Sequence, residues 1–147
     1  MKKRLLSLLL LCTLVFALSG CGEKTLLNKK KPVSLSFWHV YGEQAGSPMD
    51  LLVQEFNRTV GQERGVQVQV TGMSSASQIG GYLKDAQSGG KDVQEMPDLF
   101  TCHIVDALEL GEDNLVPWNE QFTPDELSDF IPGFLSDGTA EDGRLLI

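Results

Sequence analysis

The stretch Val33-Ser34-Leu35-Ser36-Phe37-Trp38 sets the fold that we expect for this chain. Its first, third and fifth residues are large and apolar, whereas two of the other three are serines, and this period of two predicts a β-strand. The valines of residues 66–71 repeat the alternation, and a short apolar stretch at residues 98–101 follows Pro97. We therefore expect three strands between residues 33 and 101.

Each of these strands is followed by a stretch with helical signals. After the first strand, Ser47-Pro48-Met49-Asp50 offers a Ser N-cap, a Pro at the first helical position and an acid three residues after the cap. Apolar residues at helical spacing also follow the second strand, in residues 79–86, and the third, in residues 104–108. Strands that alternate with helices predict an α/β fold, a parallel-type sheet with helices on both faces.

The last third of the chain carries weaker signals. Thr123-Pro124-Asp125-Glu126 predicts a further helix start, and Pro132-Gly133 is expected to break that helix. Residues 144–147 predict the beginning of another strand. Because this pattern has no closing turn, we expect the chain to be the N-terminal part of a longer protein.

The first twenty residues have the three-part layout of a secretory signal. Basic residues 2–4 precede an apolar run at residues 5–18, which is shorter than the roughly 20 residues of a membrane-spanning helix. The run ends in Leu18-Ser19-Gly20-Cys21, which resembles the lipobox of bacterial lipoproteins. We expect residues 1–20 to be a signal peptide and residues 21–32 to be a tether, with lipid on Cys21 at the extracytoplasmic face of the cell membrane. An unmodified Cys21 beside an ordinary cleavage site is the alternative.

Charge and cysteine content narrow the classes of partner. The 147 residues hold 12 Lys and Arg against 20 Asp and Glu, a formal net charge of −8. Loss of the three basic residues at positions 2–4 takes this charge from −8 to −11, which disfavours a nucleic-acid partner. Of the three cysteines, Cys12 falls in the signal and Cys21 at the lipid site, which leaves Cys102 without a disulfide partner.

Several short motifs occur in order along the chain. They are Leu35-Ser36-Phe37-Trp38-His39, Leu51-Leu52-Val53-Gln54-Glu55-Phe56-Asn57, Pro97-Asp98-Leu99, Leu115-Val116-Pro117-Trp118, Phe130-Ile131-Pro132-Gly133-Phe134 and Asp142-Gly143-Arg144-Leu145. In this order they resemble the extracellular solute-binding proteins of family 1, the sugar-type group that serves ABC importers. The resemblance implies a type II periplasmic-binding-protein-like fold, in which two α/β lobes hold a ligand between them. Residues 33–147 would then be the N-terminal solute-binding lobe, truncated and without its second lobe.

We expect the ligand-binding residues in the loops after the three strands, because open α/β sheets bind ligands beyond the carboxyl ends of their strands. Aromatic faces for a sugar ring and polar groups for its hydroxyls are offered there by Trp38, His39, Tyr41, Ser74, Ser75 and His103. By position, the resemblance places ligand contacts at Trp38, His39, Ser75 and His103. The residues themselves leave alternatives open: a core position for Trp38, a backbone-bonded loop position for His39, and helix capping for Ser74 and Ser75.

The function that the resemblance implies is that of a substrate-binding lipoprotein that delivers a carbohydrate to ABC permease subunits. Because the three loops hold no Lys or Arg, a neutral sugar or polyol is favoured over phosphorylated ligands. No enzyme activity, cofactor or metal is expected, since the chain has neither a Gly-x-Ser-x-Gly nor an HExxH motif and few soft metal ligands. Two alternatives stay open: a surface lipoprotein hydrolase that uses His39 or His103, and a small, complete interaction lipoprotein.

Overall fold

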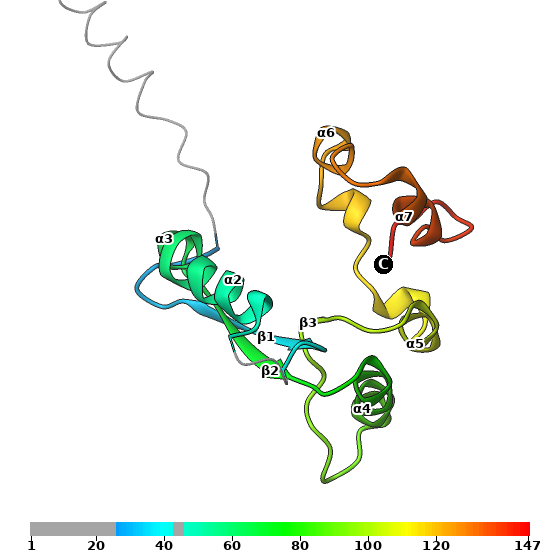
Figure 1. The fold of residues 1–147 in the computed structure, drawn as a ribbon, viewed down its shortest axis with the longest axis horizontal. Coiled ribbons are helices and arrows are strands. Elements are labelled where there is room, and N and C mark those ends of the chain that lie inside the picture. The colour runs from blue at the N-terminus through cyan, green and yellow to red at the C-terminus, as the bar shows by residue number, and fades with distance from the viewer. Residues whose placement is uncertain (1–25, 43–45) are drawn as a thin grey trace, which may run out of the picture.

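The computed structural model describes residues 26–42 and 46–147 (Figure 1). The expected signal peptide, residues 1–20, and the expected lipidation site, Cys21, lie outside these residues. Within the two described ranges, no helix is both long enough and apolar enough to cross a membrane.

The described residues form a parallel sheet of three strands in the order β2-β1-β3. The central strand, β1 (Val33–His39), pairs along its whole length with β2 (Val66–Gly72). The short β3 (Leu99–Phe100) pairs with the end of β1, opposite Phe37 and Trp38. Because all three strands are parallel, their carboxyl ends lie at one edge of the sheet. The predicted α/β class is therefore confirmed.

Helices lie on both faces of this sheet, as predicted. The elements between the strands are α2 (Pro48–Phe56), a π-helical turn (Asn57–Gly61) and α3 (Gln62–Arg64) after β1, and α4 (Ala76–Ser88) after β2. Successive residues of a strand point to opposite faces. His39 contacts Asp50 of α2, whereas its neighbour Trp38 contacts Tyr82 of α4. The two connecting helices therefore cover opposite faces (Figure 1).

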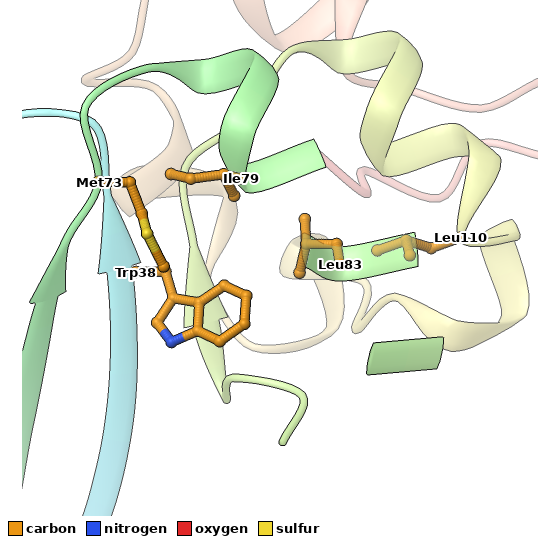
Figure 2. Close-up of a cluster of buried hydrophobic side chains, with 5 residues drawn as sticks. All are labelled: Trp38, Met73, Ile79, Leu83 and Leu110. Carbon is orange, nitrogen blue, oxygen red and sulfur yellow. The ribbon is translucent and has the colours of Figure 1, made fainter. Parts of the chain in front are cut away.

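The apolar core lies between the sheet and α4. Its buried side chains come from β1, from the loop after β2, from α4 and from the residue after α5 (Ile104–Glu109), and they are Trp38, Met73, Ile79, Leu83 and Leu110 (Figure 2). Ile79 and Leu83 are fully buried, one helical turn apart on α4. Burial of each such side chain contributes roughly 1.5–3 kcal/mol of hydrophobic stabilisation. This core fixes α4, and with it the loop that follows β2.

Polar side chains fasten the sheet at both edges. At β2, Asn57 Nδ2 donates to Val68 O (2.8 Å) and Asn57 Oδ1 accepts from Val68 N (2.7 Å), so the amide occupies the place of a neighbouring strand. At β3, Asp98 Oδ2 accepts from the backbone N (2.8 Å) and the hydroxyl (2.9 Å) of Ser36. These hydrogen bonds from Ser36 lower the pKa of Asp98, because they favour the charged carboxylate.

The last third of the chain consists of short helices. They are two 3₁₀ turns (Glu112–Asn114 and Trp118–Glu120), α6 (Pro124–Leu127) and α7 (Pro132–Asp137). In Figure 1, α6 and α7 lie together near the C-terminus and apart from the three strands. The helix start predicted at Thr123 is confirmed, and it is a full capping box: Thr123 N donates to Glu126 Oε2 (2.8 Å) and Glu126 N donates to Thr123 Oγ1 (3.3 Å).

Two expectations for this segment are wrong. Pro132-Gly133 does not break a helix but begins α7, because the first helical residue needs no N–H donor and Pro fits there. Residues 144–147 do not form a further strand of the sheet. Leu145 instead makes an isolated antiparallel bridge with Thr139, and its carbonyl accepts from Trp118 N (2.7 Å). The apolar residues at this end thus close a local turn instead of extending the sheet.

Candidate functional site

The loops after β1 and β2 lie side by side at the carboxyl edge of the sheet. Met73 N donates to His39 O (2.8 Å), which continues the pairing of the two strands into the loops. Beyond this bond the two backbones cross at Gly42 and Gly72, where a Cβ on Gly42 would lie 2.5 Å from Gly72 Cα. Only glycine at both positions leaves room for this crossing, so the local sequence holds the two predicted loops together.

Trp38 lies in the core and not on the surface of the site. Its side chain is only 4% exposed, and its ring packs edge-on against Tyr82 of α4 with the centroids 6.3 Å apart. Figure 2 shows the indole extending from β1 toward α4, beside Met73. Of the two interpretations of Trp38 from the sequence, this placement matches the core position, and a sugar has no access to the ring in this geometry.

His39 is fully buried at the end of β1, and both of its ring nitrogens have partners. Nδ1 accepts a hydrogen bond from Tyr41 N (3.1 Å), and Nε2 lies 2.9 Å from Asp50 Oδ1. A backbone N–H can only donate, so Nδ1 carries no proton here and the proton of the neutral ring sits on Nε2. His39 therefore links the loop after β1 to the first turn of α2.

Tyr41 presents an aromatic ring to solvent beside this edge. Its side chain is 43% exposed, and its ring centroid lies 6.0 Å from that of His39 with an interplanar angle of 32°. One part of the ring thus rests on the buried imidazole while another part stays open. Among the three aromatic candidates, Tyr41 has the geometry that stacking on the C–H face of a sugar requires.

Ser74 and Ser75 lie directly before α4; Ser75 is its N-cap, as in the alternative interpretation, whereas Ser74 bonds to the side chain of Gln78. Ser75 Oγ accepts from Gln78 N (3.3 Å), while the backbone N (3.2 Å) and the hydroxyl of Ser74 both donate to Gln78 Oε1. Both serines are exposed. Their hydroxyls are therefore partly engaged by the helix but remain within reach of a ligand at this edge.

His103 follows β3 and comes directly before α5. The third loop is tied to β1 through Thr101 N, which donates to Trp38 O (2.9 Å). His103 is exposed, its side chain makes no capping bond, and its carbonyl accepts from Cys102 Sγ (3.2 Å). Burial, with a smaller contribution from the charge of Asp106, raises the pKa of the Cys102 thiol, so this cysteine is held in its unreactive form.

The structure also identifies residues that the sequence interpretation missed. Asp50 was expected only as the acid of a helix start, yet its carboxylate bonds to His39, and the hydroxyl of Ser47 makes no capping bond. Two buried hydroxyls, Ser47 Oγ and Thr101 Oγ1, have no hydrogen-bond partner within residues 26–42 and 46–147. Nothing in the local sequence signals these positions. Ligand contact by the six predicted residues stays a prediction, and the geometry favours Tyr41, Ser74, Ser75 and His103 over the two buried ones.

The exposed residues at this edge offer groups for hydrogen bonding and an aromatic ring for stacking. In the described part of the chain, no three His, Cys, Asp or Glu side chains come together as a possible metal site. The buried His39–Asp50 pair has no serine or cysteine nucleophile bonded to it, because the second ring nitrogen is occupied by a backbone N–H.

A separate apolar pocket lies in the last third of the chain. It has a volume of about 360 Å³ and is lined by Trp118, Phe122, Leu127, Phe130, Phe134, Leu135, Leu145 and Ile147. Trp118 and Phe122 stack at one side with their centroids 5.7 Å apart. None of the six predicted ligand-binding residues lines it, so it is not part of the site at the carboxyl edge.

Comparison with known sequences finds no matching family model and no matching curated protein. Comparison with solved structures finds two proteins of similar fold. One is the galacto-N-biose-/lacto-N-biose I-binding protein of the ABC transporter from Bifidobacterium longum, in complex with lacto-N-biose. It has a TM-score of 0.56 and 20% identity over 77% of this chain and 27% of its own.

The other is a probable secreted solute-binding lipoprotein from Streptomyces coelicolor. It has a TM-score of 0.52 and 18% identity over 78% of this chain and 28% of its own. This chain thus spans little more than a quarter of the length of either protein. At these identities the likeness concerns the fold, and it confirms the fold expected from the sequence. The described residues share the fold of part of these two proteins, the α/β fold with a parallel sheet.

Proposed function

We propose that this chain is the N-terminal lobe of an extracytoplasmic substrate-binding lipoprotein of an ABC importer, and that its ligand is a carbohydrate. The observation that supports this most strongly is the shared fold with two solute-binding proteins, one of which was solved in complex with lacto-N-biose. Because fold alone does not determine function, the proposal also depends on the residues at the carboxyl edge of the sheet.

The exposed residues of this edge suit a neutral sugar. Tyr41 offers a half-open aromatic face, and Ser74, Ser75 and His103 offer exposed polar groups on the neighbouring loops. No Lys or Arg occurs in these loops to recognise a phosphate. Since this edge supplies one wall of a site, we place the other wall in a second lobe of the full-length protein. The lobes would close on the ligand by a hinge motion and present it to the permease subunits.

The test of carbohydrate binding is calorimetry on the full-length protein with a panel of neutral mono- and oligosaccharides that includes lacto-N-biose. We expect saturable binding of at least one sugar. Tyr41→Ala should weaken that binding roughly tenfold, because an aromatic contact is worth about 0.5–1.5 kcal/mol. Phe130→Ala is the control, since Phe130 is also exposed, at 59% against 43% for Tyr41, but lies outside the site, and it should leave the affinity unchanged. No heat of binding from any sugar or polyol would overturn the proposal.

The lipid anchor needs a separate test, because Cys21 lies outside the described residues. We propose that lipid on Cys21 holds the protein at the outer face of the cell membrane. Mass spectrometry of the membrane-extracted protein should find residues 1–20 removed and an acylated Cys21. Cys21→Ala should move the protein into the soluble fraction. Wild-type protein that is freely soluble and carries an unmodified Cys21 would contradict this part of the proposal.

A further inference from the structure

We propose that Asp50 and His39 are positioning residues for Tyr41: a chain of two hydrogen bonds, from the first turn of α2 through the buried imidazole, fixes the tyrosine at the ligand edge. This inference rests on the proposed function in one respect, namely that Tyr41 contacts the sugar. The hydrogen-bonded chain itself is a property of the described residues, and it is tested without a ligand.

The imidazole of His39 is the middle member of this chain of hydrogen bonds. It is fully buried, and its two nitrogens bond in opposite senses, Nδ1 as acceptor from Tyr41 N (3.1 Å) and Nε2 as donor to Asp50 Oδ1 (2.9 Å). Only the neutral tautomer with its proton on Nε2 satisfies both bonds. The ring of Phe37 packs against the same imidazole with the centroids 5.4 Å apart, which restricts its rotation.

Asp50 selects this tautomer. Its carboxylate accepts the Nε2 proton, and a charge-assisted bond of this kind is stronger than one between neutral groups. Asp50 stands in the first turn of the nine-residue α2, where its negative charge is also favoured by the helix dipole. Its side chain is 36% exposed, so the carboxylate keeps part of its hydration while it holds the buried ring.

The two hydrogen bonds from Asp50 through His39 determine where the Tyr41 ring lies. The backbone N–H of Tyr41 is held by Nδ1, and its ring rests against the imidazole to which that same backbone is bonded. The next residue, Gly42, is blocked from moving toward β2 by the backbone of Gly72. Without the bond to His39, only the close approach of Gly42 to Gly72 still restricts this loop, so the Tyr41 ring can tilt away from the carboxyl edge of the sheet.

The ligand-free test uses ¹⁵N NMR and amide hydrogen exchange on the full-length protein. The ring shifts of His39 should report an unprotonated Nδ1 and a protonated Nε2, and the Tyr41 amide should be protected. Asp50→Ala should speed exchange of that amide about tenfold, because the imidazole loses its part-buried bond to Asp50 and no longer holds the amide in place. Asp50→Asn keeps an acceptor at the same place and should restore most of the protection. Glu55→Ala, an exposed change elsewhere on α2, should have no effect.

The binding test separates this inference from the proposed function. With a sugar that binds, Asp50→Ala should weaken affinity as much as Tyr41→Ala, and the double variant should be no weaker than either. A protonated Nδ1, or unchanged Tyr41 exchange in an Asp50→Ala protein whose urea unfolding shows it to be folded, would overturn the positioning role whatever the sugars do. The expected shifts and exchange rates together with no sugar binding would support the chain and count against the proposed function alone.

Discussion

Two regions of this chain use apolar residues in opposite ways. In residues 33–110, the connecting helices cover the sheet and bury Ile79 and Leu83 completely. In residues 115–147, Phe130, Ile131 and Phe134 are mostly exposed around the apolar pocket, and Phe134 is 71% exposed. Both regions contain many large apolar side chains, so the regions differ in which elements cover these side chains.

The difference follows from the lengths of the elements. α4 has 13 residues and presents a full apolar face to strands that are themselves paired. α6 and α7 have four and six residues, too short to be stable as isolated helices or to cover one another's side chains. An exposed patch of large apolar residues is the usual mark of a surface that packs against something else. The core around α4 is therefore covered by its own neighbours, although Leu52 of α2 and Val105 of α5 stay exposed, whereas large apolar side chains in and beside α6 and α7 stay uncovered.

The largest expected effect compares one residue from each region. Leu83→Ala should lower the free energy of unfolding by about 2–5 kcal/mol, because it leaves a cavity in a filled core. Phe134→Ala removes a larger side chain that is mostly exposed already, and it should change the stability of residues 26–147 by less than about 0.5 kcal/mol. Urea unfolding followed by circular dichroism measures both. If the two variants lost equal stability, the exposed phenylalanine would have to be covered in solution and the comparison would fail.

The same contrast explains which parts of the fold were predictable from the sequence. The strands at residues 33–38 and 66–71 alternate cleanly, and the structure places them in adjacent β-strands. Such a pattern is predictable because each face of the sheet imposes its own requirement on every second residue. In the second region the sequence signals are local and ambiguous, because a proline can follow the end of one helix or begin the next. Pro132 begins α7.

For the candidate site, the sequence predicts that its loops meet at one edge of the sheet but not which contacts their side chains make. The carboxyl edge follows from parallel strands, and the capping alternative for Ser75 was available from its place before an apolar helical stretch. The burial of His39 could not be predicted from the sequence, because its partner Asp50 is brought near by the crossing of α2 over the sheet and not by sequence spacing. The close approach of Gly42 to Gly72 is likewise a tertiary contact between two loops, and glycine in a loop has many other causes.

A smaller effect on stability is expected from glycine-to-alanine substitutions, which test how tightly each region is packed. Gly42→Ala places a methyl group 2.5 Å from the backbone of Gly72, so a loop must move, and we expect a loss of about 1–3 kcal/mol. Gly133→Ala in α7 meets no atom within 4 Å and should stabilise the chain by up to about 1 kcal/mol, because alanine is favoured in helices. Thermal unfolding of the two variants beside the wild type gives the sign of each change. Equal tolerance at both positions would show that the glycine crossing is looser than the structure indicates.

The smallest expected effect concerns one carboxylate in each region. Asp98 accepts hydrogen bonds from Ser36, 62 residues away, whereas Glu126 accepts from Thr123 in its own capping box, and both pKa values are lowered by these bonds. A lowered pKa in the folded state means that the stabilisation is present above the unfolded value, near 3.9 for Asp, and is lost as the pH falls through the folded value.

Asp98→Asn should therefore reduce the loss of stability between pH 5 and pH 2, by at most about 1 kcal/mol because the group is exposed to solvent. Glu126→Gln should change that acid dependence less, because its bonds join residues three apart at the start of a four-residue helix and can form in part in the unfolded chain as well, which narrows the difference between the folded and unfolded pKa values. Urea midpoints measured across this pH range decide the matter, and an equal or larger change in the Glu126 variant would mean that the short helices contribute to global stability as much as the sheet does.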